Sequence, residues 1–420
     1  MAPPLRTRTT LALSLFLVGS ALLAGSPAAG APAAAAPAAA PAPPAPASWT
    51  ALASGVRYAT LDLTTARGPV RAHLVSVDLT HPKVSVDLLH PGEVAGRAPL
   101  SELADARRAV AGVNGDFFHV SETQHPGVEA TGAAVGPAVA DGRALKAAVP
   151  DGQRFGPALP KGTSTRDVLG VGYDDRARLG ELELAGTVTT PDARLPLGGL
   201  NQYALPVGSV GVFTSDWGAA SRLRATCGTD TSRAAPCSTE TYEVTVRSGR
   251  VAAVAERPGR GPIPEGTEVL VGREAGAREL RRLTVGEPVS VRHRLVAERS
   301  RVPYRFAVGG FPVLRDGSPL GGLDRVASAV RSAAGVGPDG RWLLLMALDG
   351  GTEFRSGLSV AELADLMRSL GARDAVNLDG GGSSTLVTRS PGAHAVTVRN
   401  HPSGGAERRV PNGIGVFVHR

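Results

Sequence analysis

Three acidic residues stand where apolar segments end, and carboxylates at such positions suit hydrolytic chemistry. Asp349 and Asp379 directly follow apolar runs, and Asp116 follows the apolar segment 109–113. Side chains at strand ends are held by a rigid scaffold and yet face solvent, as catalytic groups must. A pair of carboxylates is the usual device for cleaving a glycosidic bond. The alternative for each acid is a plain turn, and it carries most weight for Asp349, because Asp-Gly is a hairpin signal.

The turn after Asp379 holds more glycine than a hairpin needs. Three glycines precede three hydroxyl residues: Gly380, Gly381, Gly382, Ser383, Ser384 and Thr385. Successive glycines let backbone N–H groups converge on an anion, and hydroxyl groups add donors without bulk. The pattern therefore predicts a binding turn for a sugar phosphate beside the acid.

Other polar residues form a second set of candidates for binding the same ligand. They are Asn114, Arg331, Asn377, Asn400, Ser403, Glu407 and Arg408. An amide binds a sugar hydroxyl or a phosphate oxygen, and an arginine holds phosphate bidentately. The alternatives are an Asn-Gly turn at Asn114, an ion pair between Arg331 and a core acid, and a solvated loop at 400–409. Phe117 or Phe118 would stack on a pyranose ring, unless both belong to the core.

Several other classes of function lack their signatures. The chain has no Gly-x-Ser-x-Gly elbow, no Gly-x-x-x-x-Gly-Lys loop and no His-Glu-x-x-His helix. Its net charge of +7 is spread along the sequence, whereas nucleic-acid-binding proteins cluster their basic residues. The nine histidines are scattered, with His119 and His125 placed to line a cleft near Asp116. We therefore expect no nucleic-acid partner.

The N-terminus has the order of a secretory signal. Arg6 and Arg8 precede an apolar stretch at 11–23, and small residues follow it. Because this stretch is too short to span a membrane comfortably, we expect a signal peptide at 1–30, a secreted protein and no stable membrane insertion after cleavage. An uncleaved anchor is the alternative. Ala/Pro repeats at 31–48 predict an extended linker.

The only two cysteines predict a local disulfide. Cys227 and Cys237 are separated by nine residues and flanked by Gly, Thr and Pro. In an exported chain such a pair is typical of a disulfide. A zinc site would need further Cys or His ligands at close spacing, and none accompanies them.

Most of the remaining pattern predicts strands. They lie within residues 56–89, at 109–113, as a hairpin at 242–254, and at 342–348, 375–377 and 412–418. Residues 150–300 are rich in short apolar runs between turns, and the pattern leaves open whether this middle segment is a subdomain. We expect an α+β fold, with a strand-rich sheet core, a few helices and the β-rich middle segment, in one domain at 49–420.

Two helices stand out. Ser359 and Glu362 form a capping box ahead of a helix with one apolar face, which Gly371 ends. A shorter helix is predicted at 101–108, with Ser101 as its cap.

With these motifs in order, the sequence resembles the phosphodiester glycosidase family. The motifs are Val-Asn-Gly-Asp-Phe-Phe118, Arg331-Ser, Leu-Asp349-Gly-Gly, residues 357–367, Asn377-Leu-Asp-Gly-Gly-Gly-Ser-Ser-Thr385 and Asn400-His-Pro-Ser-Gly-Gly-Ala-Glu-Arg408. The likeness runs from about Val56 to Val418. Family members often carry His-Pro-Arg-Thr where this chain has Ala329-Val-Arg-Ser332, so Arg331 matches and the preceding histidine does not.

The resemblance implies a hydrolase that cleaves a glycosyl-1-phosphodiester at the anomeric carbon, acting on a sugar phosphate or a cell-wall or exopolysaccharide glycopolymer. Asp379 and Asp116 are the candidates for the paired carboxylates, with Asp349 in reserve. Guanidinium groups and the glycine-rich turn would neutralise the phosphate. No cofactor is required, although three clustered acids suit Mg²⁺ or Ca²⁺. The alternatives are a non-catalytic cell-wall binding protein and a metal-dependent phosphodiesterase, and the oligomeric state stays open.

Overall fold

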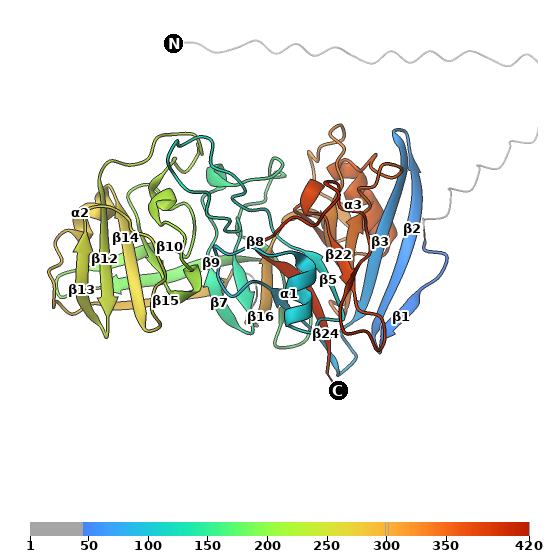
Figure 1. Ribbon diagram of the computed structural model, residues 1–420, viewed down its shortest axis with the longest axis horizontal. Helices are drawn as coiled ribbons and strands as arrows, with labels where there is room; N and C mark the ends of the chain where they lie inside the picture. The colour runs from blue at the N-terminus through green and yellow to red at the C-terminus, as the bar shows by residue number, and fades with distance from the viewer. Residues whose placement is uncertain (1–44, 299, 301, 420) are drawn as a thin grey trace, which may run out of the picture. The chain divides into compact units, whose positions relative to one another are not determined.

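Strands are the dominant secondary structure of the described residues, and they form three β-sheets (Figure 1). The computed structural model describes residues 45–298, 300 and 302–419. The predicted signal peptide and most of the predicted linker lie outside these residues. Within them, 24 strands accompany only three α-helices. The fold is therefore mostly β, and the expected α+β class holds only in the broad sense of a strand-rich core with a few helices.

The first sheet has eight strands and contains most of the C-terminal elements. In spatial order its strands are β1 (Thr50–Ala53), β2 (Val56–Thr65), β3 (Gly68–Asp78), β20 (Trp342–Leu348), β19 (Ser332–Val336), β21 (Asp374–Leu378), β17 (Phe311–Arg315) and β18 (Ser318–Pro319). The apolar run of β20 is buried on both faces, since Leu343 and Leu345 face one cluster and Leu344 faces another. A continuous apolar run is what such a strand requires.

The second sheet has five strands from both ends of the domain. In order they are β23 (Thr397–Val398), β22 (Leu386–Thr388), β5 (Ala111–Asn114), β24 (Gly413–Val418) and β4 (Val84–Leu89). The predicted strands at 109–113 and 412–418 are confirmed as β5 and β24, and the structure shows that they pair.

The third sheet has eleven strands and holds the β-rich middle of the sequence. In order they are β13 (Arg250–Ala255), β12 (Thr241–Arg247), β14 (Thr267–Arg273), β11 (Val210–Phe213), β10 (Arg194–Leu200), β9 (Ala177–Thr189), β8 (Asp167–Gly172), β16 (Tyr304–Gly309), β6 (Ala138–Ala140) and β7 (Arg143–Lys146), with β15 (Ser290–Ala297) paired to β9. The predicted hairpin at 242–254 is confirmed as β12 and β13.

The helices are α1 (Leu100–Ala106), α2 (Ala275–Leu280) and α3 (Val360–Ser369). The capping box of α3 is confirmed, because Ser359 and Glu362 exchange side-chain bonds with each other's N–H groups. The predicted cap of α1 is wrong. Pro99 holds the N-cap position of α1, and the N–H of Ser101 donates instead to Glu407 at 3.0 Å.

The largest apolar cluster joins all three sheets. Val75 of β3, Val113 of β5 and Leu169 of β8 are each fully buried in it. On the opposite face of the eight-stranded sheet, Leu363 and Met367 of α3 pack in a second cluster. The central strands of the eight-stranded sheet are therefore covered on both faces.

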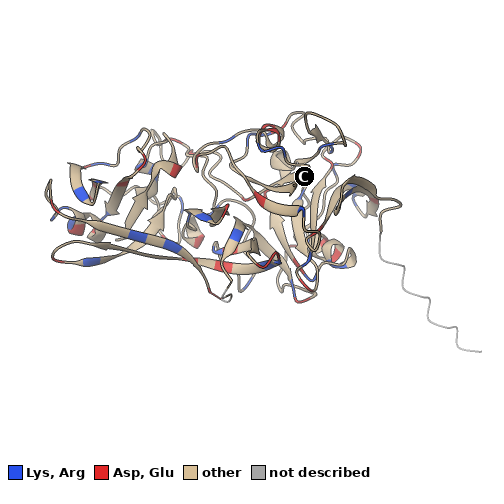
Figure 2. Ribbon diagram, turned by 90° about the horizontal axis from the view of Figure 1, so that it is seen from below, with Lys and Arg blue, Asp and Glu red and all other residues tan. Residues whose placement is uncertain are grey.

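Basic and acidic residues are interspersed over the described elements (Figure 2). Many form surface ion pairs, such as Arg71 with Asp62 at 2.6 Å and Arg281 with Glu256 at 2.6 Å. No helix within the described ranges is long and apolar enough to cross a membrane.

Candidate active site

The register of three neighbouring strands brings three candidates to one sheet edge. β19 runs antiparallel to both β20 and β21, with Ser332 opposite Ala347 and Leu378. The start of β19 therefore lies beside the ends of the other two. Arg331, Asp349 and Asp379 meet at this edge, although up to 48 residues separate them in the sequence.

Asn114 joins this edge to the five-stranded sheet. Its Nδ2 donates to the carbonyl of Asp379 at 2.7 Å. Its Oδ1 accepts from the hydroxyl of Ser332 at 2.6 Å and from the N–H of Thr385 at 3.1 Å. The residue is 1% exposed, so its amide fixes the geometry of two sheets and is largely hidden from a sugar. Its predicted role in binding the substrate stays a prediction.

Asp379 contacts Asn114 through its backbone carbonyl and is partly exposed. Its N–H donates to the carbonyl of Gly115 at 2.9 Å, and its Oδ1 accepts from the N–H of Gly380 at 3.0 Å. Burial raises the pKa of Asp379 to about 6, against the opposing effects of Ser383, Arg408 and the Gly380 N–H. A carboxylate that titrates near neutrality is a typical proton-transfer group.

Asp116 lies deeper than Asp379 and is 2% exposed. Its Oδ2 accepts from the N–H of Gly136 at 2.5 Å, while its buried Oδ1 has no partner among the described residues. Burial raises the pKa of Asp116, and the negative charge of Asp379 adds to the effect. The two predicted carboxylates are thus electrostatic neighbours with raised pKa values, as the paired acids of a hydrolase would be.

Lys146 is a candidate that the sequence interpretation missed. Its ammonium is 1% exposed and donates to the carbonyls of Val135, Gly136 and Ala147 at 3.3, 2.5 and 2.6 Å. Burial lowers the pKa of Lys146, and Asp116 opposes this. Three donors facing three acceptors favour the charged form, so a buried cation lies behind the buried acid. The available signal was one of only three lysines standing in an apolar segment, residues 144–149.

Asp349 lies at the same strand ends, but its neighbours are two histidines. Its Oδ2 accepts from His401 Nδ1 at 2.9 Å and lies 3.2 Å from His73 Nε2, while Oδ1 accepts from the N–H of Gly351 at 2.7 Å. Burial alone would raise the pKa of Asp349, but these hydrogen bonds together lower it. Asp349 is therefore an anion that holds two histidines, neither of which the sequence interpretation selected.

Most N–H groups of the glycine-rich turn already have protein acceptors. Those of Gly381 and Ser383 donate to the carbonyls of Val330 and Gly380 at 2.8 and 3.1 Å, and that of Thr385 serves Asn114. The expected anion-binding role of the turn therefore stays a prediction. Gly382 has a separate structural purpose, because a Cβ there would lie 2.5 Å from Arg408 Nη2.

Arg408 is the guanidinium best placed for a phosphate. It is exposed, its Nη1 donates to Ser383 Oγ at 3.3 Å, and its charge acts on Asp379. Arg331, by contrast, is 7% exposed and donates to the carbonyls of Leu358 and Ala327 at 3.0 Å each. Phosphate binding by Arg331 stays a prediction, and it would have to use the N–H donors that these two bonds do not occupy.

Asn377 faces the α3 side of the sheet, since its cross-strand partner Ala333 packs in the cluster around α3. Both its Oδ1 and its Nδ2 are buried without a partner in the described ranges, as is the hydroxyl of Thr385. Such unsatisfied buried polar atoms are rare in folded proteins.

The remaining predicted binding residues divide into one near the turn and two structural ones. Ser403 Oγ donates to the carbonyl of Gly381 at 3.2 Å. Asn400 accepts from the N–H of Leu386 and donates to the carbonyl of Ser384, both at 2.8 Å. Glu407 serves the first turn of α1.

The aromatic residues after Asp116 belong to the core. Phe117 stacks on Phe311 with ring centroids 4.6 Å apart, and Phe118 is 3% exposed in another cluster. The expectation that either ring stacks on a sugar is wrong, because the chain buries both in building the junction between sheets.

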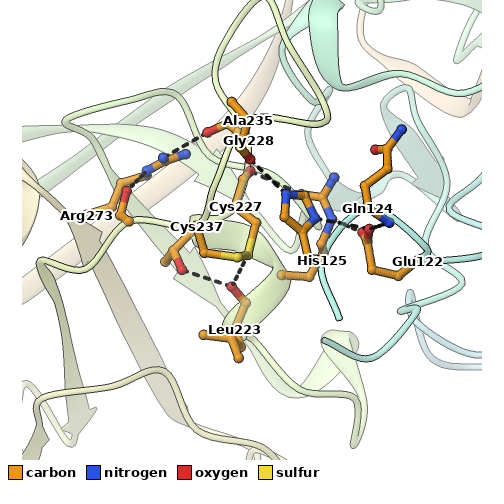
Figure 3. Close-up of a disulfide and its surroundings, with 12 residues drawn as sticks. Glu122, Gln124, His125, Leu223, Cys227, Gly228, Ala235, Cys237 and Arg273 are labelled. Atoms are coloured by element: carbon orange, nitrogen blue, oxygen red, sulfur yellow. Dashed lines mark hydrogen bonds and ion pairs between the residues drawn. A yellow bond between two sulfur atoms is a disulfide. The ribbon is translucent and has the colours of Figure 1, made fainter. Parts of the chain in front are cut away.

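His119 and His125 anchor the loop that follows, and they do not line an open cleft. Both rings bond the buried Glu122, at 2.9 and 3.0 Å, and Arg224 completes the cluster through its own ion pair with Glu122. His125 also donates through Nε2 to the carbonyl of Ala235 at 2.8 Å, inside the loop that the disulfide closes (Figure 3).

The predicted disulfide between Cys227 and Cys237 is confirmed. In the described part of the chain, one group of three potential metal-ligating residues converges, and it consists of His125 and these two cysteines. Their sulfur atoms are bonded to each other, so the group offers no thiolate. The expectation of Mg²⁺ or Ca²⁺ at the three acids stays a prediction.

A cavity of about 630 Å³ lies elsewhere, between β9, β10 and neighbouring loops, with Asp151, Arg166 and Glu183 in its lining. None of the candidate residues contributes to it. We locate the candidate site by the convergence of acids, histidines and an exposed arginine, since cavity size alone names no chemistry.

Comparison with protein families gives one match. Residues 240–417 match the family model described as phosphodiester glycosidase, which confirms the resemblance in the motifs. No curated protein matches the sequence.

Two solved structures, from Synechocystis and from Burkholderia pseudomallei, share the fold. A hypothetical protein from Synechocystis is 22% identical and aligns over 87% of this chain with a TM-score of 0.66, and this chain spans 62% of the length of that one. A "Putative exported protein" from Burkholderia pseudomallei is 25% identical, with 83% of this chain and 74% of that chain aligned and a TM-score of 0.63. The zebrafish N-acetylglucosamine-1-phosphodiester α-N-acetylglucosaminidase catalytic domain, auto-inhibited by its pro-peptide, aligns over 90% of this chain and 87% of its own at 15% identity and a TM-score of 0.42.

Proposed function

From the match of residues 240–417 to the phosphodiester glycosidase family, we propose that this protein is a hydrolase that cleaves a glycosyl-1-phosphodiester at the anomeric carbon. The observation that carries the proposal is the joining of two acids from distant segments. The N–H of Asp379 donates to the carbonyl of Gly115, and Asn114 holds the carbonyl of Asp379, so Asp116 and Asp379 become neighbours.

The two carboxylates have unequal access to a ligand, which supports unequal roles. Asp379 is partly exposed and faces the anomeric carbon, either as nucleophile or as the base that activates water. Asp116 is the more buried of the two and neighbours Lys146, and a negative charge on Asp116 would make Asp379 less ready to lose a proton. Inversion or retention at the anomeric carbon distinguishes the base from the nucleophile.

Phosphate recognition falls first to Arg408, because its guanidinium is exposed and lies next to Ser383. A guanidinium binds phosphate with two parallel N–H bonds. Ser383, Ser403 and the remaining donors of Arg331 complete the proposed anion site. No cofactor is required for this cleavage, and Mg²⁺ or Ca²⁺ is an alternative that the assay below includes.

The N-terminal signal pattern and the disulfide support secretion, so the proposed substrate is a sugar phosphate or a glycopolymer of the cell wall or exopolysaccharide. A disulfide persists in an oxidising compartment. Cleavage at 1–30 would remove Arg6 and Arg8 and leave a net charge of +5 (+7 − 2), which would also attract the protein to anionic polymers outside the cell.

Hydrolysis in ¹⁸O-water tests which bond breaks. The enzyme is incubated with a panel of methyl glycosyl-1-phosphodiesters, and the products are analysed by mass spectrometry. Attack at the anomeric carbon places the label in the sugar, as we expect. Label in the phosphate would instead support a phosphodiesterase that cleaves the P–O bond.

The same assay separates the remaining alternatives. Turnover that persists after dialysis against a chelator supports metal-free hydrolysis, whereas activity restored only by Mg²⁺ or Ca²⁺ supports the metal-dependent enzyme. Absence of turnover across the panel, with binding retained by calorimetry, would favour the non-catalytic binding protein.

A further inference from the structure

His401 stands on Asp349 with one ring nitrogen held and the other open. Its Nδ1 lies 2.9 Å from Asp349 Oδ2, and its backbone N–H reaches the same oxygen at 3.3 Å. The side chain of Asp349 is 2% exposed, while that of His401 is 79% exposed. In the described part of the chain no group bonds Nε2 of His401, so this nitrogen faces solvent.

The contacts of His73 and His401 with Asp349 indicate which ring nitrogens carry protons. His73 Nε2 lies 3.2 Å from Asp349 Oδ2, and Tyr58 Oη lies 2.8 Å from His73 Nδ1. Burial lowers the pKa of His73, against the effect of Asp349, which favours a neutral ring. An anionic Asp349 accepts from both rings. His73 therefore donates through Nε2 and accepts from Tyr58, and His401 donates through Nδ1.

Charges surround this chain of hydrogen bonds on each packed element. Arg71 of β3 lies near Asp349 and is paired with Asp62, and Glu353 acts on Arg71 from the following loop. Arg399 lies over the ring of Tyr58 at 5.1 Å. The positive charges of Arg71 and Arg399 offset the negative charges of Asp62 and Glu353. Asp349 is the anion that directly contacts His401.

Close packing of glycines brings His401 to the edge that carries Asp379. Gly350 N–H donates to the carbonyl of His401 at 2.8 Å, and a Cβ at Gly351 would lie 2.9 Å from Asp349 Oδ1. Two residues farther on, Ser403 bonds the carbonyl of Gly381. The 400–403 loop thus bridges the Asp349 turn and the Asp379 turn.

We propose that His401, oriented by Asp349, is the proton donor to the phosphate oxygen that leaves the sugar. The inference rests on the proposed function and adds a residue to it. The bond between the anomeric carbon and the phosphate oxygen breaks, its electron pair stays on that oxygen, and the Nε2 proton joins it. Water supplies the new hydroxyl group. Its proton goes to Asp379 where Asp379 acts as the base, and to the deprotonated Nε2 of His401 where Asp379 acts as the nucleophile.

Imidazole matches this leaving group better than a carboxylic acid does. A phosphomonoester takes up its second proton with a pKa of about 6, so the leaving oxygen is a weak base that needs only partial protonation. A general acid is most effective when its pKa lies near that of its task. The imidazolium also brings positive charge to the departing anion, and Asp349 keeps its Nδ1 proton in place.

The kinetic test compares His401→Gln with wild type on two leaving groups. We expect the variant to lose about 100-fold in kcat/KM on a glycosyl phosphodiester and far less on the matching glycosyl fluoride, whose leaving group departs without a proton. Asp349→Asn should reproduce both effects, and the double variant should lose little more, because the two residues act as one unit.

A spectroscopic readout checks the geometry independently of turnover. Nitrogen-15 NMR should show the Nδ1–H tautomer for neutral His401 in wild type and a mixture in Asp349→Asn. Methyl phosphate should shift the ring signals of His401 but not those of the exposed His394, and His394→Gln serves as the kinetic control.

The outcomes separate the two proposals. An active wild type with an equally active His401→Gln variant, or ring signals that ignore methyl phosphate, overturns the role of His401 and leaves the hydrolase standing. Wild type that cleaves no member of the panel overturns the proposed function, and the proton-donor role with it.

Discussion

At the scale of single residues, Asn114 decides which acids can cooperate. Its buried amide donates to the carbonyl of Asp379 and accepts from Ser332 and Thr385. An amide that is satisfied on both sides is rigid, and it leaves the carboxylate of Asp379 as the group that a ligand meets. The residue is thus a structural joint between strand ends.

Replacing Asp379 by Asn tests the central acid of the proposed mechanism. We expect Asp379→Asn to lower kcat roughly 10³-fold or more, because the amide neither attacks carbon nor takes a proton from water. Wild-type activity should rise with pH as Asp379 ionises around its pKa of about 6. Turnover within tenfold of wild type would remove Asp379 from the mechanism.

The same variant has a predictable effect on stability. The pKa of Asp379 is raised on folding from the usual 3.8 to about 6, so ionisation disfavours the folded state, and stability falls as the pH rises through this window. Asp379→Asn should therefore match wild type near pH 4 and exceed it at pH 8 by on the order of 2 kcal/mol. Thermal unfolding at the two pH values measures the difference.

At the scale of elements, the edge of the eight-stranded sheet is built by antiparallel register. β20 and β21 both end where β19 begins, so the turns after Leu348 and Leu378 face each other across one strand. The glycines after Asp349 let the 400–403 loop approach closely, since a Cβ at Gly350 would meet Ser403 and His401.

Gly350→Ala tests that close approach. Its backbone is outside the positive-φ region, but a Cβ would lie 2.5 Å from Ser403 Oγ and 2.8 Å from the carbonyl of His401. We expect the loop to shift and kcat/KM to fall roughly tenfold or more. Gly404→Ala is the matched control in the same loop, because nothing lies within 4 Å of its Cβ position. Equal activity of the two variants would show that the contact is dispensable.

At the scale of the whole molecule, loops and buried ion pairs tie the eleven-stranded sheet to the other two. Asp167 of β8 pairs with Arg315 of β17 at 2.5 Å. The loop after Asp116 is held to the disulfide-closed segment by Glu122, His125 and Arg224. The position of the deeper acid therefore depends on contacts far from the sheet edge.

Removing both cysteines tests how much the disulfide contributes. We expect the Cys227→Ser and Cys237→Ser double variant to lose about 2–3 kcal/mol of unfolding free energy, since the closed loop is short. Its kcat should stay near that of wild type, because Glu122, His125 and Arg224 still hold the loop. Chemical denaturation and the turnover assay measure the two quantities. A folded double variant without activity would show that the disulfide itself positions the site.

Several features followed from sequence alone because they depend on neighbours along the chain. The capping box of Ser359 and Glu362, the hairpin of β12 and β13 and the buried run of β20 are set by local propensity and periodicity. The short separation of Cys227 and Cys237 likewise predicted their bond. Acids after apolar runs could be placed at strand ends for the same reason.

Tertiary structure alone decided the partners of those acids. Asp116 lies with Asp379 and Lys146, whereas Asp349 lies with His73 and His401. These groups come from strands and loops that are 30 to 328 residues apart (146 − 116 and 401 − 73), and their meeting depends on strand order and register. Periodicity shows that a segment is a strand and which face is buried. It does not show which strand pairs with which, because that choice is made by the free energy of packing three sheets together.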